Sequence, residues 1–313
     1  MECAQREKRG MKTENSKVNI LLSSYNGAAY IGQQIDSVLS QNYPYLELYI
    51  RDDGSEDHTV DLLRRNYASQ TESIHIVEGE NVGFARSFYR LLKEAEEGEY
   101  WAFCDQDDVW YPDKIGKALN WLEHQENDLP LLFHSAYETY TQDLAQKTGT
   151  VLPPAQPVDF RRAMTDCVYQ GFSMVINRPL REQLLRCREE NLGTHDWMAM
   201  LIAVAFGRHH YDNIPVSMHR RLSGSLSAMD FKSRFRWFLR TLTEESDTRK
   251  MLREFERVFG GMLPEEKAGI LRRFTKEGFH CKDSLWKAFY PGRWRPCLSS
   301  EAAVRLLMLF GRI

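Results

Sequence analysis

The chain has 313 residues, of which 42% are hydrophobic and 27% are charged, and its 41 basic and 44 acidic side chains give a formal net charge of -3. This composition is typical of a globular protein. It argues against a disordered chain, a collagen-like fibre and a strongly basic protein with a nucleic-acid partner. Because a single core stops growing at roughly 250–300 residues, the length permits one large domain or two smaller ones.

The charge is unevenly distributed along the chain. Residues 229–313 contain 18 basic and 11 acidic side chains, whereas residues 1–228 contain 23 basic and 33 acidic ones. The six cysteines form no C-x-x-C pair and no metal-finger spacing, so we expect reduced thiols in a cytoplasm. Residues 1–17 read as a charged tail without the apolar core of a signal peptide, and the longest apolar stretch, Trp197–Phe206, is about half of a membrane span.

The first 140 residues alternate between short apolar runs and helical patterns. The expected strands and helices, in chain order, are Val18–Ser23, Ile31–Leu39, Leu46–Ile50, a helix containing Val60 and Leu63 with Asp57 as its cap, Ile74–Val77, Phe84–Glu97, Tyr100–Cys104 and Pro112–Glu126. This alternation predicts an α/β fold in which helices cover a parallel sheet.

The second part of the chain is less regular. Residues 142–165 are rich in proline and are expected to form an irregular connection, followed by a strand at Ser173–Ile176 and a helix at Pro179–Glu190. Thr194 is expected to cap a helix over His195–Phe206, which is apolar nearly all round and should be buried. From Met229 onward the pattern is helical.

Polar side chains follow each of the first four expected strands. The four segments are Ser24-Tyr25-Asn26-Gly27, Asp52-Asp53, Glu80-Asn81-Val82-Gly83 and Asp105-Gln106-Asp107-Asp108. In parallel sheets a ligand binds beyond the carboxyl ends of the strands, so these segments predict a polar site at one edge.

Two of these segments concentrate carboxylates. Five aspartates at neighbouring strand ends repel one another unless a cation or a hydrogen-bonding ligand compensates them. An Asp-x-Asp turn offers oxygen ligands to Mg²⁺ or Mn²⁺, which then holds substrate phosphates. The alternative is that these acids are solvated caps, and for Asp52 and Asp53 singly that alternative is nearly as good as a contact with a base or ribose. No glycine-rich phosphate-binding motif occurs.

The motifs S-S-Y-N-G, R-D-D-G-S-x-D, N-x-G-F-A-R and F-C-D-Q-D-D-V-W, in this order, resemble those of family 2 glycosyltransferases with the GT-A fold. The D-Q-D-D-V-W form is similar to that of bacterial rhamnosyltransferases of cell-surface polysaccharide synthesis. The resemblance covers roughly residues 17–228. It implies a Rossmann-like, mostly parallel central sheet flanked by helices over residues 18–228, with residues 229–313 as a helical, basic C-terminal extension.

The resemblance also implies roles for individual residues. A nucleotide-sugar site would be formed by Ser24, Tyr25, Asn26, Asp52, Asp53, Asn81, Arg86, Asp105, Gln106, Asp108, Trp110, Gly171 and Arg220. Asp105 and Asp107 would hold the metal and the diphosphate, with Asp108 beside the donor sugar. Asp196, within Thr194-His195-Asp196-Trp197, would be the catalytic base.

The chemistry of inversion supports a base of this kind, because a carboxylate must take the proton from the acceptor hydroxyl as it attacks. The alternative for Asp196 is a capping role in the first turn of its helix. Trp110 and Trp197 flank the acidic motifs as a sugar platform or, more commonly, as core residues. His209 and His210 have no partner pattern and are expected to be structural.

One departure from the family pattern concerns the metal site. Relatives often carry a Y-R-x-H segment whose histidine completes the site, and here Leu222 occupies the corresponding position. Either His219 substitutes from a shifted position or the metal is held by aspartates and water. Arg220 and Arg221 are expected near the diphosphate or in a solvated turn.

The basic C-terminal region contains three amphipathic stretches, Phe231–Leu242, Trp286–Arg295 and Val304–Ile313. Such stretches lie in the interface of an anionic membrane, or they pack as a helical bundle on the catalytic domain. We therefore expect a cytoplasmic protein with peripheral contact on the inner face of the plasma membrane.

The combined expectation is an inverting glycosyltransferase that uses Mg²⁺ or Mn²⁺. Its donor would be dTDP-rhamnose, or alternatively a UDP-sugar, and its acceptor a polysaccharide or lipid-linked saccharide. From other classes, a sugar-nucleotide nucleotidyltransferase shares the sheet but should show a glycine-rich activating loop, and a non-catalytic binding module should have lost its acidic residues.

Overall fold

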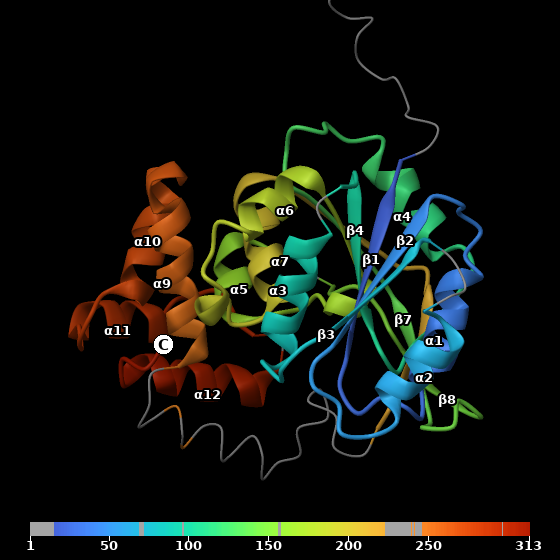
Figure 1. The fold of residues 1–313 in the computed structure, drawn as a ribbon. Helices are drawn as coiled ribbons and strands as arrows, with labels where there is room; N and C mark the ends of the chain where they lie inside the picture. Colours follow the sequence, from blue (N-terminus) through green and yellow to red (C-terminus); the bar gives the residue numbers. More distant parts are fainter. Residues whose placement is uncertain are drawn as a thin grey trace, which may run out of the picture.

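The computed structural model describes residues 16–68, 72–95, 97–155, 158–222, 239, 241, 246–295 and 297–313 (Figure 1). Its central element is a seven-stranded sheet in the order β10-β6-β9-β4-β1-β2-β3. Neighbouring strands in this sheet are parallel, except that β9 runs antiparallel to both β4 and β6. The mostly parallel sheet predicted from the sequence is confirmed.

The first four strands and helices follow the predicted alternation. Their bounds are β1 Val18–Ser24, α1 Ile31–Leu39, β2 Leu46–Asp52, α2 Thr59–Asn66, β3 Ile74–Glu78, α3 Phe84–Glu94, β4 Tyr100–Asp105 and α4 Lys114–Leu122. The last two helices are shorter than predicted, since α3 ends at Glu94 and α4 begins at Lys114. Asp57 precedes α2 and accepts a hydrogen bond from the Thr59 amide at 2.9 Å, so it satisfies one of the free amides at that end.

The later elements complete the main sheet and cover it. These are β6 Leu131–Ser135, α5 Phe160–Thr165, β9 Met174–Asn177, α6 Arg178–Leu184, α7 His195–Phe206 and β10 Arg208–Asp212. The Thr194 hydroxyl caps α7 by accepting from the Trp197 amide at 3.4 Å, as predicted. Most residues of α7 are buried, also as predicted.

A second, four-stranded sheet lies beside the first and has the order β5-β11-β7-β8. Its strands are β5 Val109–Trp110, β7 Tyr137–Tyr140, β8 Lys147–Val151 and β11 Ser217–Arg220. The prediction that residues 142–165 are irregular was therefore wrong, because they contain β8 and α5. The sheet has a functional consequence: β11 pairs with β5 and so brings His219 next to the acidic segment that follows β4.

Alternating side chains give the main sheet two apolar faces. In β1, Ile20 and Leu22 face the core shared with α1, α2 and α4, whereas Leu21 faces the core shared with α3, α5, α6 and α7. Figure 1 shows these two sets of helices on opposite sides of the sheet. The second core is the larger one because it continues into the C-terminal helices.

The C-terminal helices are α9 Asp247–Phe259, α10 Glu265–Thr275, α11 Cys281–Ala288 and α12 Leu298–Leu309. Aromatic contacts join α9 to the rest of the protein: the Phe255 ring lies 6.0 Å from Phe160, and the Phe259 ring lies 5.7 Å from Phe206. Packing as a helical bundle, one of the two expected arrangements, is what these helices show. Of the expected stretch Phe231–Leu242, all but residues 239 and 241 lie outside the described residues, as do residues 1–15.

No helix in the described part of the chain has the length and apolar character needed to cross a membrane. The described cysteines, Cys104, Cys167, Cys187, Cys281 and Cys297, are free thiols, as expected.

Candidate functional site

The carboxyl ends of β1, β2 and β4 meet at one edge of the main sheet. The register pairs Ser23 with Asp105 and Ser24 with Asp52, so the polar segments that follow these strands begin side by side. The sequence prediction of a polar edge therefore matches the arrangement of these strands.

Asp52 lies at the end of β2 and is almost completely buried, with an exposed fraction of 1%. Its carboxylate accepts hydrogen bonds from the Ser24 hydroxyl at 2.9 Å, the Ser55 amide at 2.8 Å and the Ser55 hydroxyl at 2.6 Å. These bonds fasten the end of β1 to the turn after β2. Asp52 thus makes the contacts of a capping residue, the alternative given for it beside contact with a base or ribose, and the Ser24 hydroxyl takes part in the same network.

Asp53 is also buried and stabilises a different loop. Its carboxylate forms an ion pair with Arg51 and accepts hydrogen bonds from the amides of Val82, at 3.1 Å, and Gly83, at 2.8 Å. Arg51 also donates to the Glu80 carbonyl at 3.0 Å. The pair thus anchors the loop between β3 and α3, which carries Asn81.

Tyr25 and Asn26 form the turn after β1, where their side chains are exposed. The Gln106 amide group bonds the Tyr25 backbone at two points, accepting from its N–H at 2.8 Å and donating to its C=O at 3.0 Å. Asn26 has a positive φ of 49° and its side-chain oxygen accepts from the Glu56 amide at 2.8 Å. Gln106 therefore joins the turn after β1 to the turn after β4.

Asn81 and Arg86 lie at the start of α3 and both are exposed. The Asn81 side chain accepts a hydrogen bond from the Gly83 amide at 3.2 Å. Arg86 makes no ion pair with a described residue and so leaves a cationic group at this edge for a ligand.

Asp105 and Asp107 form the acidic centre of the site. Burial, followed by the nearby charges of Asp108 and Asp107, raises the pKa of Asp105 well above its ordinary value. Burial and the Asp108 charge raise the pKa of Asp107 to about 6, although His219 and Arg220 act in the opposite direction. Neither carboxylate has an ion pair within the described residues, so a cation at this centre would stabilise the ionised form of both.

Asp108 forms a buried pair with His219. The Asp108 side chain is fully buried, and one of its oxygens lies 2.8 Å from His219 Nδ1. Because a carboxylate only accepts hydrogen bonds, Nδ1 donates, and Nε2 keeps its lone pair when the ring is neutral. The His219 ring stacks on Phe172 at 4.6 Å. Burial tends to lower the pKa of His219, but the hydrogen bond from His219 to Asp108 and the nearby carboxylates outweigh burial and raise it.

The expected place of Asp108 beside the donor sugar does not match this burial, since its carboxylate is turned to His219 and away from solvent.

Trp110 is likewise a core residue with 2% of its surface exposed, and the Lys114 ammonium lies 4.2 Å from its ring centre. A sugar platform at Trp110 is therefore not available in this structure. The side chain of Trp197 is half-buried and its ring N–H donates to the Ala163 carbonyl at 2.6 Å.

Arg220 is buried next to His219 on β11. Its guanidinium donates to the Gln142 carbonyl at 2.7 Å and to the Gln33 side chain, and it lies 5.0 Å from the Tyr30 ring centre. Its charge partly offsets the rise in the pKa of Asp107. Arg221 is exposed, and His209 and His210 lie on β10 in contact with aromatic rings, in agreement with a structural role.

Asp196 lies in the first turn of α7 and its side chain bonds in two directions. One oxygen accepts from the Trp197 amide at 2.8 Å, as a capping residue does, and the other accepts from the Gly171 amide at 3.2 Å. Its charge contributes to the raised pKa of Asp105. Asp196 as a whole residue is half-buried.

Gly171 and His195 are in close contact beneath Asp196. A Cβ atom added at Gly171 would lie 2.5 Å from His195 Nε2, so no side chain fits there. The His195 ring lies between Phe88 and Phe103, at 4.2 and 4.6 Å, and burial lowers its pKa to about 4. The imidazole is therefore neutral at physiological pH.

Two buried residues that position the 170–173 loop had no signal in the sequence. Lys114 Nζ donates to the Phe172 carbonyl at 2.7 Å, and His134 Nε2 accepts from the Gln170 amide at 3.0 Å. Burial lowers the pKa of Lys114 to about 8, although nearby acids oppose this shift. Lys114 resembles a surface residue at a helix start, and no local pattern pairs it with a carbonyl 58 residues away.

A metal ion fits the residues that are present, provided that a ligand completes its coordination. Among the described residues, no group of three or more His, Cys, Asp or Glu side chains is arranged as a complete metal site. Mg²⁺, however, is typically held by one or two carboxylates together with substrate phosphates and water. Asp105 and Asp107 supply such carboxylates, and the Asp108–His219 pair has the form of a carboxylate that orients a metal-binding histidine.

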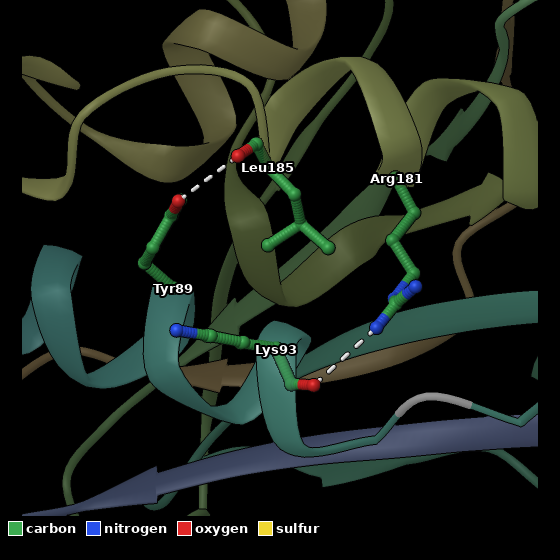
Figure 2. Close-up of a pocket in the computed structure, with 4 residues that line it drawn as sticks. All are labelled: Tyr89, Lys93, Arg181 and Leu185. Atoms are coloured by element: carbon green, nitrogen blue, oxygen red, sulfur yellow. Dashed lines mark hydrogen bonds between the residues drawn. The ribbon is translucent and has the colours of Figure 1, made fainter.

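A separate hollow of about 420 Å³ lies between α3 and α6, where Tyr89, Lys93, Arg181 and Leu185 line it (Figure 2). Tyr89 donates to the Leu185 carbonyl at 3.2 Å and Arg181 to the Lys93 carbonyl at 3.4 Å. Lys93 is in the last turn of α3, whereas the candidate site lies at the first turn. The hollow contains none of the predicted site residues.

Comparison with solved structures supports the fold. The chain superposes on residues 1–349 of TarS from S. aureus with a TM-score of 0.55 at 16% sequence identity, covering 94% of this chain and 89% of that fragment. It superposes on the mannosyltransferase PcManGT from Pyrobaculum calidifontis, solved with GDP-Man and Mn²⁺, with a TM-score of 0.52 at 16% identity, covering 99% and 91%. These superpositions confirm the predicted GT-A fold.

Sequence comparison identifies the family. The family model described as "Glycosyl transferase family 2" matches residues 19–184. The chain is 30% identical over 230 residues to a putative teichuronic acid biosynthesis glycosyltransferase, TuaG, of Bacillus subtilis, covering 71% of this chain and 86% of TuaG. It is 35% identical over 105 residues to the dTDP-rhamnosyl transferase RfbG of Shigella flexneri, covering 32% of this chain and 36% of RfbG. The chain therefore belongs to glycosyl transferase family 2.

Proposed function

We propose that this glycosyltransferase is metal-dependent, inverts the configuration of the transferred sugar and uses Asp196 as its base. The observation that supports the proposal is the grouping of charges at the carboxyl end of β4: the charges of Asp107, His219 and Asp196 all act on the pKa of Asp105, and those of Asp105 and Asp107 act on the pKa of His219. Family membership decides against the nucleotidyltransferase and the non-catalytic module, the two alternatives from other classes.

In the proposed reaction an acceptor hydroxyl attacks the anomeric carbon from the face opposite the nucleoside diphosphate. The bond between that carbon and the diphosphate oxygen breaks, a glycosidic bond forms with inverted configuration, and the hydroxyl proton passes to the Asp196 carboxylate. The bond from the Gly171 amide to one Asp196 oxygen orients the carboxylate. Neutral His195 beneath it adds no competing positive charge.

We propose that Asp105 and Asp107, with His219 as a further ligand once the donor is bound, would hold Mg²⁺ or Mn²⁺, since the described residues offer no complete three-residue site of their own. The cation would compensate the charge that develops on the leaving diphosphate. The chain's own contribution is to orient the ligands, since Asp108 fixes the His219 ring and β11 holds His219 next to the acidic segment. Arg86, exposed at the start of α3, is proposed to contact the same diphosphate.

The proposed donor is dTDP-rhamnose, and a UDP-sugar is the alternative. The similarity to RfbG, a dTDP-rhamnosyl transferase, favours dTDP-rhamnose as the donor. This similarity covers 105 residues. We propose Ser24, Tyr25, Asn26, Asp53, Asn81 and Gln106 as the frame of the nucleotide pocket, with Asp52 and Asp53 acting through the loops that they anchor.

A thermal-shift screen of dTDP, UDP and GDP, each with and without Mn²⁺, tests the donor proposal. The protein should be stabilised by one nucleotide, dTDP if the proposal is right, and only when Mn²⁺ is present. Stabilisation by UDP with Mn²⁺ would select the alternative donor. Stabilisation that does not depend on Mn²⁺ would contradict the metal proposal.

The acceptor is proposed to be a growing polysaccharide or a lipid-linked saccharide. The similarity to TuaG, a protein named for teichuronic acid biosynthesis, supports an acceptor of the cell envelope. A lipid-linked acceptor would place the enzyme on the inner face of the plasma membrane.

A further inference from the structure

The last two helices expose an unusual amount of apolar surface. Fifteen large hydrophobic side chains of the described residues are exposed, and six of them lie in the short segment 279–310. The exposed fraction reaches 72% for Phe289 and 70% for Leu298. This apolar face consists of Phe279, Leu285, Phe289, Leu298, Leu306 and Phe310.

Helical spacing gathers these side chains on the outer side of both helices. In α12 and the residue after it, Leu298, Leu306 and Phe310 are separated by multiples of four residues, whereas Val304 and Met308 are buried in the core. In α11, Leu285 is exposed and Ala288 is buried in the same core. Both helices bury one side in the same core. Their exposed apolar side chains therefore lie on the opposite side, which faces away from the protein.

The two helices are fastened together, so their outer sides form one surface. Arg305 of α12 donates to the carbonyls of Ala288, at 2.6 Å, and Tyr290, at 2.9 Å. At the other end, a Cβ added at Gly311 would lie 2.7 Å from the Phe279 ring. The helices therefore run in opposite directions and are in contact at both ends.

The charges of this segment are segregated by sign. Its acidic side chains, Asp283 and Glu301, are buried, and they pair with Arg273, at 2.7 Å, and Arg305, at 2.6 Å. The exposed cations Lys282, Arg293 and Arg312 have no ion pair with a described residue. Within the described part of 279–313, the exposed surface therefore combines apolar and cationic side chains with no acidic ones.

The orientation of α12 relative to the site is compatible with a substrate at a surface. In Figure 1, α12 lies at the lower end of the molecule, the end toward which β1 runs. The candidate site lies at the carboxyl ends of β1, β2 and β4. A flat partner in contact with α12 would thus lie at the same end of the molecule as the site.

We propose that the outer face of α11 and α12 docks on an anionic lipid membrane. The apolar side chains insert at the boundary between headgroups and acyl chains, and Lys282, Arg293 and Arg312 contact lipid phosphates. A lipid surface fits better than an acidic protein because the apolar residues are spread along two helices rather than gathered in a pocket. Docking would give the proposed glycosyltransferase access to a lipid-linked acceptor. Membrane binding itself does not depend on sugar transfer.

The test is flotation of the full chain with phosphatidylcholine vesicles that contain or lack phosphatidylglycerol. The protein should float with the anionic vesicles at low ionic strength and detach at high salt, since exposed charges are screened. Each cation that is removed should weaken binding about fivefold, so the variant Lys282→Gln, Arg293→Gln, Arg312→Gln should bind about hundredfold more weakly. The variant Phe289→Ser, Leu306→Ser should lose binding at every salt concentration.

Matched variants on other surfaces serve as controls. Arg65→Gln, Lys93→Gln, Arg186→Gln changes the net charge by the same amount, and Leu152→Ser, Ile214→Ser removes apolar side chains that are also exposed. Both controls should float like the unmodified protein. Because flotation uses no donor, a failure here is separate from a failure of the thermal-shift screen with nucleotides.

Three results would overturn the proposal. They are no flotation with anionic vesicles, equal flotation with neutral vesicles, and equal losses in the control and test variants. Size-exclusion chromatography adds a fourth. If the unmodified protein is a dimer that does not bind vesicles, and if Phe289→Ser, Leu306→Ser dissociates that dimer, this face is a subunit interface.

Discussion

Asp52 and Asp53 show what the sequence predicts well and what it does not at the scale of a residue. The motif indicates that both belong to the site, and the register brings them to its edge. Their roles follow from partners distant along the chain, such as the Val82 and Gly83 amides for Asp53. Local patterns do not contain such pairings, and for the same reason Lys114 and His134 were not predicted.

We expect ionised Asp107 to destabilise the folded protein when no metal is bound and to be needed for metal-dependent nucleotide binding. Its raised pKa of about 6 means that the ionised carboxylate is destabilised by burial and by Asp108. Asp107→Asn should therefore raise the free energy of unfolding by about 1–3 kcal/mol at pH 8 without divalent cations, because one pKa unit corresponds to about 1.4 kcal/mol. The same variant should weaken Mn²⁺-dependent nucleotide binding.

Urea denaturation with a chelator measures the first effect, and a nucleotide titration with Mn²⁺ measures the second. Asp128→Asn is the matched control, since Asp128 is exposed on the surface and should change neither quantity. If Asp107→Asn is destabilised without metal, the electrostatic account of the acidic centre is wrong.

Asp108 is expected to act on the metal through His219. Asp108→Asn keeps the shape of the side chain but removes the charge that holds Nδ1–H and raises the pKa of His219. Loss of such a supporting carboxylate typically costs 10–100-fold in metal affinity. The apparent Kd for Mn²⁺ in the presence of nucleotide should rise by that factor, with dTDP or UDP binding unchanged when the metal is saturating. An unaltered Kd would contradict the role of Asp108 in supporting a metal-binding His219.

At the scale of elements, the alternation of β1 to α4 was predictable because each element carries its own period of apolar residues. The short strands β7, β8, β10 and β11 were not, since they are polar and form through their pairing: β10 with β6, β11 with β7, and β8 with its chain neighbour β7. In β10 the sequence is Arg-His-His-Tyr-Asp, which shows no apolar alternation. The functional consequence is large, because β11 carries His219 to the site.

The contact between the 170–173 loop and α7 should be intolerant of added volume. In Gly171→Ala the new Cβ would lie 2.5 Å from His195 Nε2, so the loop or α7 must shift and Asp196 must lose its present position. We expect a loss of about 1–3 kcal/mol in stability and at least tenfold in kcat. Gly116→Ala is the control: nothing lies within 4 Å of that position in α4, and the alanine should stabilise the helix. Full activity of Gly171→Ala would contradict the proposed support of Asp196.

At the scale of the whole molecule, the C-terminal helices were predicted as helices but with two possible partners. Their amphipathic pattern does not predict which side of each helix packs against protein and which side is exposed to solvent or lipid. The structure shows one side in the core shared with α5 and α7, through residues such as Phe255. The other side remains apolar, so both expected uses of these helices are compatible.

The acidic centre also predicts how the protein responds to pH. With a folded pKa of about 6 against an ordinary value of 3.8, Asp107 binds more protons in the folded than in the unfolded state between these limits. Without metal, stability should therefore fall as pH rises from about 4 to about 6. Metal affinity should show the opposite trend and weaken as pH falls below about 6, because protons compete for the carboxylate. Unfolding and Mn²⁺ titrations across this range measure both trends, and Asp107→Asn should reduce them.

The most direct test of the central claim compares transfer and donor binding in Asp196→Asn. Asparagine can still accept from the Gly171 amide but cannot take the acceptor proton. We predict that transfer from the donor found in the nucleotide screen falls by at least a hundredfold, of the order expected for loss of a general base, while Mn²⁺-dependent binding of its nucleoside diphosphate is unchanged. Normal turnover in this variant would contradict the assignment of Asp196 as the base and the account of the site built around it.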